Sequence, residues 1–373
     1  MNLTPETARA WVDVDLRALV ANARTLVGLT GTRLLPMVKA NGYGLGAVAV
    51  ARALESLDPW GYGVASVEEG AALRAAGIVR PVLVMSPLLP DAIDAHLAHD
   101  LRPTIGDLPA LAAWCRRGAG PFHVEIDTGM SRAGFRWDDA PALVAAVALL
   151  REAGGWEGLF THFHSADTDP DSAVVQWDRF QGVLATMPRR PALVHAANSV
   201  AALQGRRFAG DLIRPGIFLY GGAAGGSAPA PAPLPVATLM ARVIAVRAVA
   251  AGETVSYGAT WRAPRATTVA TIALGYADGF LRAARDGAAG SLASALPPRV
   301  VELSGALVPV VGRVTMDMTM VDAGEGRPTP GDVATIYGGR VSLDQQAAAA
   351  GTIAYELLTA LGPRVPRRYG REP

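Results

Sequence analysis

The first 220 residues alternate between short apolar or β-branched runs and Ala/Leu-rich stretches, and this alternation limits the folds open to the chain. Eight of the runs are predicted to be strands: Arg33–Val38, Gly61–Ala65, Pro81–Met85, Leu101–Ile105, Phe122–Ile126, Glu157–Phe163, Ala192–His195 and Asp211–Phe218. The helices predicted between them include Gly46–Leu57, Val67–Ala76, Leu108–Arg117, Ala140–Ala153 and Ser172–Ala185. Eight strands with crossover helices predict an α/β fold with an N-terminal (β/α)8 TIM-type barrel. A doubly wound open sheet is the alternative.

A change of texture after this region predicts a second domain. Residues Gly221 to Pro235 form a Gly/Ala/Pro run that can continue neither a helix nor a central strand, so we interpret it as a linker. Beyond it we predict a C-terminal mainly-β domain, closed by one helix at about Leu343–Leu361. Its predicted strands are Val236–Val249, Thr267–Leu274, Val300–Leu303, Leu307–Val311, Thr319–Val321 and Val333–Ile336. We expect domains at 1–230 and 231–373, with the first residues able to pack against the second, and a surface insertion at Arg282–Ser294.

The composition excludes several classes of protein. A net charge of +1 gives no electrostatic reason to expect nucleic acid or a membrane surface as partner. Cys115 is the only cysteine, which fits a reducing compartment. The N-terminal residues lack the layout of a signal peptide, and no apolar run reaches the roughly 18 residues of a spanning helix. We therefore expect a cytoplasmic protein.

Lys39 is the only lysine in a chain that carries 34 lysine and arginine residues in total. A guanidinium group stays protonated, whereas a desolvated lysine amine can lose its proton and act as a nucleophile or a base. Lys39 follows a predicted strand and precedes a Gly-rich turn, where barrel enzymes place their chemistry. This position favours amine chemistry over a surface lysine left without a role.

Other polar residues also follow the predicted strands. Arg132 could bind a carboxylate in a bidentate manner, or could be a solvated arginine in a turn. Ser199 follows the seventh predicted strand, and the backbone N–H groups of Gly216 and Ile217 lie at the end of the eighth, where barrels often bind phosphate. His162 and His164 could form a metal pair, but further ligands are lacking in the sequence around them, so we expect no metal.

Taken together, these segments resemble bacterial alanine racemase, over about Trp11 to Tyr369. The resemblance is carried by eight motifs in the same order: Val-Lys-Ala-Asn-Gly-Tyr-Gly at 38–44, Asp-Thr-Gly-Met at 127–130, Ala-Asn-Ser at 197–199, Arg-Pro-Gly-Ile at 214–217, Ser-Tyr-Gly-Ala-Thr at 256–260, Gly-Tyr-Ala-Asp-Gly at 275–279, Val-Gly-Arg-Val-Thr-Met-Asp at 311–317 and Arg-Val-Pro-Arg at 364–367.

The resemblance implies a racemase that uses pyridoxal 5'-phosphate to interconvert L-alanine and D-alanine and so supplies D-alanine for peptidoglycan. It implies Lys39 as the cofactor-carrying lysine and first base, and Tyr257 as the second base, supplied by the other subunit of a homodimer with shared active sites. Arg132 would contact the cofactor and bind the substrate carboxylate, His162 would lie against the cofactor ring and Arg214 would pair with the ring nitrogen. The phosphate would be held by Tyr43, Ser199, Gly216, Ile217 and Tyr355. Tyr276 and Met316 of the opposite subunit would line the substrate's way in, with Glu125 and Asp317 in supporting roles.

Two residues depart from the pattern of the family. Many members have a carbamylated lysine seven residues before the arginine, and this chain has Glu125 there. We hypothesise that Glu125 supplies the negative charge directly and orients Arg132. His164 stands where a small residue is usual, which leaves the preference for alanine over serine open.

Two further hypotheses come from other classes of function. A non-enzymic pyridoxal-phosphate carrier would need only the barrel, whereas the β domain with Tyr257 and Tyr276 argues for a second base. A metal-dependent barrel hydrolase could use His162 and His164, but the position of Lys39 and the missing ligands argue against it.

Overall fold

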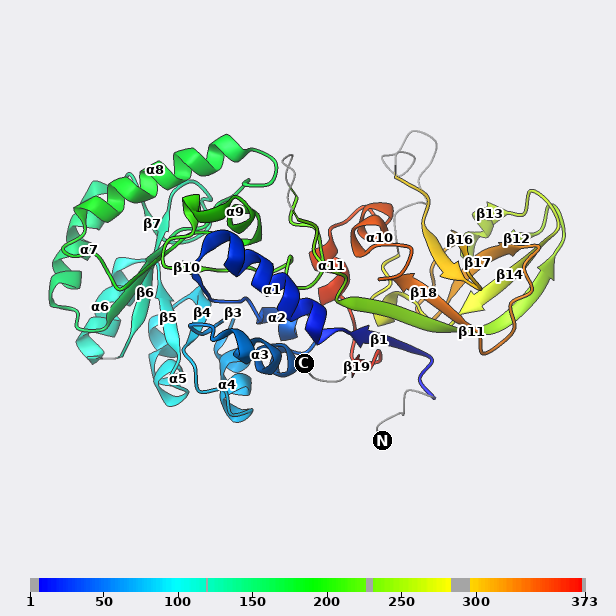
Figure 1. The fold of residues 1–373 in the computed structure, drawn as a ribbon, viewed down its shortest axis with the longest axis horizontal. Coiled ribbons are helices and arrows are strands. Elements are labelled where there is room, and N and C mark those ends of the chain that lie inside the picture. Colours follow the sequence, from blue (N-terminus) through cyan, green and yellow to red (C-terminus); the bar gives the residue numbers. More distant parts are fainter. Residues whose placement is uncertain (1–6, 119, 226–230, 283–295, 371–373) are drawn as a thin grey trace.

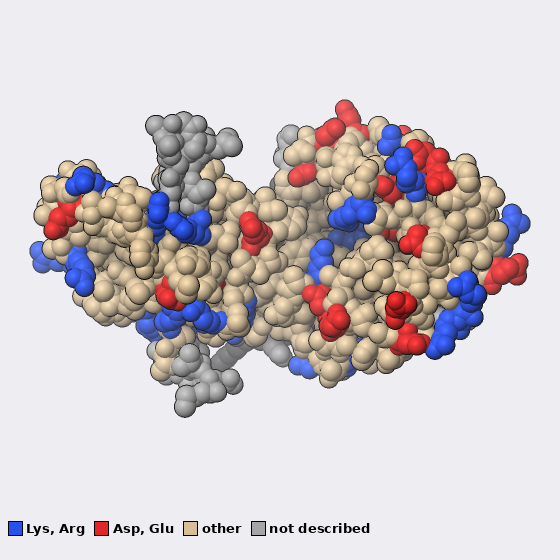
Figure 2. All heavy atoms as spheres, turned by 180° about the vertical axis from the view of Figure 1, so that it is seen from behind, with Lys and Arg blue, Asp and Glu red and all other residues tan. Residues whose placement is uncertain are grey.

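The computed structural model describes residues 7–118, 120–225, 231–282 and 296–370, so most of the predicted insertion at Arg282–Ser294 and the middle of the predicted linker lie outside the described residues. It has two parts along its long axis, a barrel surrounded by helices and a sheet-rich part (Figure 1). Basic and acidic side chains are interspersed over the face drawn in Figure 2. No helix among the described residues is long and apolar enough to span a membrane.

The first part is a closed barrel of parallel strands, in the order β2-β10-β9-β8-β6-β5-β4-β3. A parallel bridge between Met37, just after β2, and Gly63 in β3 closes the ring. The strands are β2 (Arg33–Leu34), β3 (Tyr62–Val64), β4 (Val82–Pro87), β5 (Arg102–Ile105), β6 (Phe122–Asp127), β8 (Trp156–Phe160), β9 (Leu193–His195) and β10 (Leu212–Ile213). The short β7 (Phe135–Arg136) adds to the edge of β6. The predicted TIM-type barrel is therefore confirmed, and the open sheet is wrong.

The helices of this part cover the outside of the barrel (Figure 1). They are α1 (Leu16–Thr30), α3 (Ala47–Leu54), α4 (Val67–Ala75), α5 (Ile93–Ala98), α6 (Leu108–Arg117), α7 (Ala140–Glu152), α8 (Pro170–Thr186) and α9 (Ser199–Leu203). Apolar residues of β6 pack in one core cluster with Trp114 of α6 and Phe180 of α8. Because successive strand side chains alternate, His123 and Glu125, which lie between these apolar residues, face the barrel interior. The barrel thus carries polar groups inside.

Several barrel strands are shorter than predicted, and proline accounts for two of them. β2 ends at Leu34 and β10 ends at Ile213, shortly before Pro36 and Pro215. Proline has no N–H to donate to a neighbouring strand, so regular pairing stops there. β8 ends at Phe160, which places His162 and His164 in a loop rather than on one face of a strand.

The second part is an antiparallel sheet built around the long strand β11 (Ala237–Val249). β11 pairs with both β14 (Thr267–Ile272) and β18 (Val333–Tyr337), which closes this sheet through β15 (Val300–Leu303), β16 (Ala306–Val311) and β17 (Thr319–Gly324). The N-terminal strand β1 (Ala10–Val14) also pairs with β11, and β19 (Arg367–Tyr369) pairs with β1. A separate ribbon joins β12 (Thr254–Val255) to β13 (Trp261–Arg262). The predicted mainly-β domain is confirmed.

The prediction of a single helix closing the chain is wrong. Residues 343–361 form two helices, α10 (Leu343–Ala349) and α11 (Ala354–Thr359). Gly351 lies between them with φ +71°, a left-handed conformation that ends a right-handed helix. The break matters for the site, because α11 packs against the segment that follows Lys39: a Cβ on Gly44 would lie 2.2 Å from the Leu358 carbonyl oxygen.

Candidate active site

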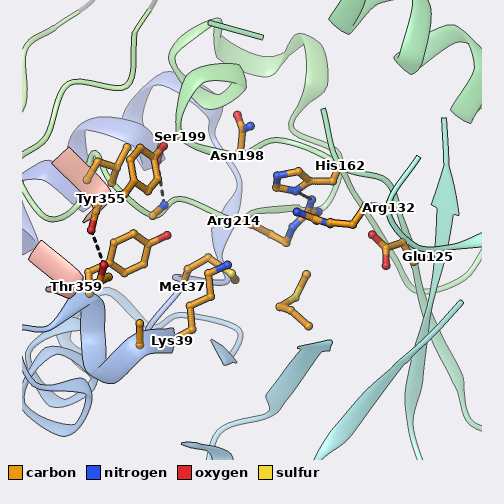
Figure 3. A pocket seen from close by; sticks show the side chains of 15 residues that line it. Met37, Lys39, Glu125, Arg132, His162, Asn198, Ser199, Arg214, Tyr355 and Thr359 are labelled. Carbon is orange, nitrogen blue, oxygen red and sulfur yellow. Dashed lines mark hydrogen bonds between the residues drawn. The ribbon is translucent and has the colours of Figure 1, made fainter. Parts of the chain in front are cut away.

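A cavity of about 260 Å³ lies at the carboxyl ends of the barrel strands. Most of the residues predicted for the site line it: Lys39, Tyr43, Glu125, Arg132, His162, Ser199, Arg214, Gly216, Ile217 and Tyr355. In Figure 3 the Lys39 side chain reaches into the cavity from one side, and Arg132, Arg214 and His162 face it from the other. Tyr355 comes from α11, so the second part of the chain completes the cavity wall.

Lys39 is the only amine side chain in this cavity. Burial lowers the pKa of its amine, and the guanidinium groups of Arg132 and Arg214 lower the pKa further, whereas Glu69 raises it. Both burial and nearby positive charge disfavour the protonated form of a lysine. The amine is therefore easier to deprotonate than a lysine in water, as a nucleophile or base requires.

Arg214 is 2% exposed and donates hydrogen bonds in several directions. Its Nη2 donates to the carbonyl oxygens of Thr161 (2.7 Å) and Ala196 (3.1 Å). Its Nη1 lies 2.6 Å from Nδ1 of His195. Burial lowers the pKa of Arg214 to about 10, so it remains a cation at neutral pH. These bonds hold the guanidinium in one orientation at the cavity wall.

His162 is held neutral beside that cation. Its Nδ1 lies 3.4 Å from Nη2 of Arg214, and since a guanidinium only donates, Nδ1 accepts and the ring proton is on Nε2. Burial, and then the charge of Arg214, lower the pKa of His162 to about 3. His164 is exposed and its Nδ1 contacts the Ser165 hydroxyl, so the two histidines do not form a metal pair. No group of three potential metal ligands occurs in the part of the chain that the structure describes.

A chain of buried histidines, which the sequence analysis did not predict, continues from Arg214 through the barrel interior. Because Arg214 donates to Nδ1 of His195, the other ring nitrogen of His195 carries the proton and donates to Nδ1 of His123, at 2.8 Å. His123 in turn donates from Nε2 to Glu157 at 3.3 Å. Burial lowers the pKa of both histidines. The first histidine of this hydrogen-bond chain is a neutral acceptor for the Arg214 N–H group, so the positive charge of Arg214 is not neutralised by a carboxylate in direct contact.

A second group of residues forms a small cradle of neutral donors. The Ser199 hydroxyl oxygen accepts the N–H of Gly216 at 2.9 Å and that of Phe218 at 3.4 Å, which leaves its own proton free to donate. A Cβ on Gly216 would lie 2.2 Å from the Tyr43 hydroxyl, so only glycine fits there. Burial raises the pKa of Tyr43, and raises that of Tyr355 to about 12, so both phenols keep their protons. Such a cradle suits an anion.

Glu125 and Arg132 lie side by side at the far wall of the cavity (Figure 3). Glu125 is 5% exposed. Burial raises the pKa of its carboxyl group, and the opposing effects of Arg132 and Arg214 do not compensate for the burial. The Glu125 carboxyl group therefore interacts with the cations of Arg132 and Arg214, from the position where many family members have a carbamylated lysine.

Tyr257, Tyr276, Met316 and Asp317 do not reach this cavity. They line a separate pocket of the second part of the chain, together with Arg313. Tyr257 is 72% exposed, Tyr276 42% and Met316 53%. The loops that carry Tyr276 and Met316 are joined by backbone hydrogen bonds, including Ala277 N–H to the Met316 carbonyl oxygen at 3.0 Å. One copy of the chain therefore presents the two predicted bases at two separate places.

The cavity also contains residues that the sequence analysis did not name as site residues. They are Met37, Ala40, Met85, Asn198 and Thr359. Met85 lies within β4 and Met37 three residues after the end of β2, so a position near a strand end was a usable signal for both. Their apolar side chains gave no chemical signal. Thr359 lines the cavity only because α11 packs against the barrel, and the sequence alone did not predict this packing.

Comparison with known proteins decides the family. Residues 14–224 match the family model "Alanine racemase, N-terminal domain", and residues 236–369 match "Alanine racemase, C-terminal domain". The chain belongs to the alanine racemase family. Alanine racemase from Deinococcus radiodurans is 39% identical over 97% of this chain and 99% of that protein. The enzyme from Acidiphilium cryptum is 38% identical over 95% of this chain and 97% of its own length.

Solved alanine racemase structures have the same fold. The crystal structure from E. faecalis is 32% identical, with a TM-score of 0.87 over 99% of this chain and all of that chain (100%). The structure from Bartonella henselae, with covalently bound pyridoxal phosphate, is 30% identical, with a TM-score of 0.86 over 97% of this chain and 100% of that chain. Both parts of this chain are therefore those of an alanine racemase.

Proposed function

We propose that this protein is a pyridoxal-phosphate-dependent alanine racemase, which interconverts L-alanine and D-alanine. The family match over residues 14–224 and 236–369 supports this function. The observation that carries it is the single amine of Lys39, which faces Arg132 and Arg214 in one cavity. An amine of lowered pKa can carry the cofactor or move a proton, and a guanidinium can bind a substrate carboxylate.

The residues of the cavity fit pyridoxal phosphate. The cradle of Ser199, Gly216 and Tyr43 offers neutral donors to a phosphate group and has no room for a Cβ at Gly216. Lys39 would hold the aldehyde carbon, and Arg214 would donate a hydrogen bond to the ring nitrogen while keeping its own proton. His162 would lie against the ring, and Ile217 and Tyr355 would complete the phosphate end. When bound, the cofactor supplies an electron sink for the substrate's α-carbon.

Racemisation also requires a second base. One proton must leave the α-carbon and another must return on the opposite face, so two bases on opposite faces do this without turning the substrate. Lys39 is one candidate, and we propose Tyr257 as the other. A free tyrosine has a pKa near 10, so acting as a base near neutral pH requires its environment to favour the phenolate.

Because Tyr257 lies outside the Lys39 cavity, we propose that a second copy of the chain supplies it. The large side chains of Tyr257, Tyr276 and Met316 are exposed around one pocket, as expected of residues that a partner covers. A homodimer would bring this group of one copy to the cavity of the other. Tyr276 and Met316 would then line the substrate's way in, with Asp317 supporting them.

The remaining proposals concern the cellular role and the domains. We propose that the protein supplies D-alanine for peptidoglycan from the cytoplasm, and that residues 1–230 and 231–373 are its cofactor-binding and β domains. Glu125 is proposed to orient Arg132.

The test uses purified protein and added pyridoxal phosphate. We expect a visible absorption band that borohydride abolishes, with the reduced adduct on Lys39 by mass spectrometry. The same sample should convert L-alanine to a mixture of L- and D-alanine, and L-serine serves to measure selectivity. A sample that binds the cofactor at Lys39 and leaves L-alanine unchanged would contradict the proposed reaction.

A further inference from the structure

The segment that follows Lys39 is left-handed. Ala40, Asn41, Gly42 and Tyr43 have φ values of 53°, 53°, 62° and 52°, and Gly44 continues at 79°. Left-handed turns cost roughly 1–2 kcal/mol for each residue other than glycine, with asparagine more tolerant than most. A run of this kind persists only where surrounding contacts hold it. The position of Lys39 therefore depends on whatever fixes this turn.

One side chain from outside the segment bonds to the start of the turn. Glu69, in α4, accepts the N–H of Ala40 at 2.6 Å through Oε1. Its other oxygen accepts the N–H of Ala65, directly after β3, at 2.7 Å. One carboxylate thus ties the left-handed turn, the end of a barrel strand and a helix together. Gly46 N–H donates to the Asn41 carbonyl oxygen at 2.8 Å within the segment, and Arg367 of β19 donates from Nε to the Gly44 carbonyl oxygen at its far end, at 2.7 Å.

The use of Glu69 departs from its ordinary local role. Ser66 caps α4, and Glu69 lies three residues later, the spacing of a capping box in which the glutamate would bond to the N–H of the capping residue. Here the carboxylate bonds past Ser66 to Ala65 and across to Ala40. The helix therefore has only the Ser66 half of a capping box, and both carboxylate oxygens of Glu69 accept backbone N–H groups beside the cavity.

Glu69 is also the negative charge that acts on the Lys39 amine. The charged groups around Lys39 come from several elements: Arg132 from the loop after β6, Arg214 from the segment after β10 and Glu69 from α4. His162 is neutral there, and Glu125 lines the same cavity beside Arg132. Burial and the two arginines lower the pKa of Lys39, and Glu69 raises it.

We propose that Glu69 is a positioning residue for Lys39, which holds the left-handed turn against β3 and balances the two arginines that face the amine. This inference rests on the proposed function for the importance of Lys39. Its geometry does not depend on the cofactor, so it can be tested in cofactor-free protein.

The single lysine makes a direct test possible. An amine-reactive reagent labels only Lys39 and the N-terminal amine, and mass spectrometry of the two peptides separates them. The labelling rate of Lys39 against pH reports the pKa of its amine. We would compare the unchanged chain with Glu69→Gln and with the control Glu68→Gln, whose glutamate is the exposed neighbour on the same helix.

In Glu69→Gln we expect the labelling midpoint of Lys39 to move to lower pH, because the opposing negative charge is lost. We also expect an about tenfold loss of affinity for pyridoxal phosphate, the size of one hydrogen bond to a charged group. Glu68→Gln should match the unchanged chain in both measurements. A midpoint in Glu69→Gln equal to that of the control would overturn the proposal, whatever the affinity.

If Glu69→Gln does not fold, by circular dichroism, hydrogen exchange in the unchanged chain decides. The amides of Ala40 and Ala65 should exchange slowly, and exchange of Ala40 at the rate of an unstructured peptide would overturn the proposal. A protein that passes these tests and makes no D-alanine would leave the role of Glu69 intact and contradict the proposed reaction instead.

Discussion

Replacing Glu125 by glutamine removes one negative charge from the cavity and preserves the shape of the side chain. Glu125 is 5% exposed and lies beside Arg132. In the proposed reaction Arg132 binds the substrate carboxylate, and Glu125 orients it. Glu125 and Arg132 interact as charges, and two unit charges about 4 Å apart attract by about 1 kcal/mol in water and about 4 kcal/mol at an effective dielectric of about 20. Each 1.4 kcal/mol is about tenfold in an equilibrium constant. We therefore expect KM for alanine to rise about 10- to 100-fold in Glu125→Gln, with a smaller change in kcat.

The pH dependence gives this prediction a second readout. Burial raises the pKa of Glu125 above that of a free glutamate, so protonation sets in as the pH falls through the raised value. The unchanged enzyme should therefore lose substrate affinity on the acid side, and Glu125→Gln should lack this limb. Because a raised pKa penalises the ionised form in the folded state, the substitution should not lower the free energy of unfolding at neutral pH.

Steady-state racemisation of L-alanine between acid and neutral pH measures both effects. Glu152→Gln, at the exposed end of α7, is the matched control and should behave as the unchanged enzyme. Unchanged kcat and KM in Glu125→Gln, with the acid limb still present, would refute the reasoning.

Three further predictions concern the cradle, the buried histidines and the loops of the second part. Gly216→Ala would place a methyl group 2.2 Å from the Tyr43 hydroxyl, so its affinity for pyridoxal phosphate, measured by absorbance titration, should fall about tenfold. The control Gly182→Ala, where a Cβ would have nothing within 4 Å, should leave this affinity unchanged. His195→Phe leaves Arg214 without an acceptor for Nη1, so the free energy of unfolding in denaturant should fall by about 2–3 kcal/mol; an unchanged midpoint would contradict the hydrogen-bond chain. Asp278→Asn removes a buried carboxylate that pairs with Arg9 and Arg364. The free energy of unfolding should therefore fall by about 3 kcal/mol, and KM for alanine should rise because Tyr276 is close by. A free energy of unfolding equal to that of the unchanged protein would contradict a net contribution from these ion pairs.

The sequence was most informative where local pattern decides structure. The barrel strands appear in the predicted order because each is a short apolar run between helical stretches, as at Phe122–Asp127. The helix at Leu108–Arg117 has the predicted bounds, since Asp107 caps its start and Gly118 ends it. Lys39 could be singled out because the chain has one lysine.

Features that depend on distant contacts could not be predicted. The left-handed turn at Ala40–Tyr43 is bonded at its start by Glu69, 29 residues further along the chain, and just past its end by Arg367. The chain from Arg214 to His123 arises only when β6, β9 and the segment after β10 place their side chains together in the barrel. The break at Gly351 was hidden because the residues on both sides of it favour helix, so one helix was predicted where α10 and α11 occur.

Complementation between two inactive variants tests the central proposal most directly. Lys39→Ala and Tyr257→Phe should each be inactive alone. In a mixed dimer one site would combine both defects and the other would have both bases intact, so co-expression should restore about a quarter of the normal activity if half of the dimers are mixed. Racemisation of L-alanine by the co-expressed pair, with each variant alone at background, is the result that we predict. No recovery in dimers shown to be mixed would contradict an active site built from Lys39 of one copy and Tyr257 of another.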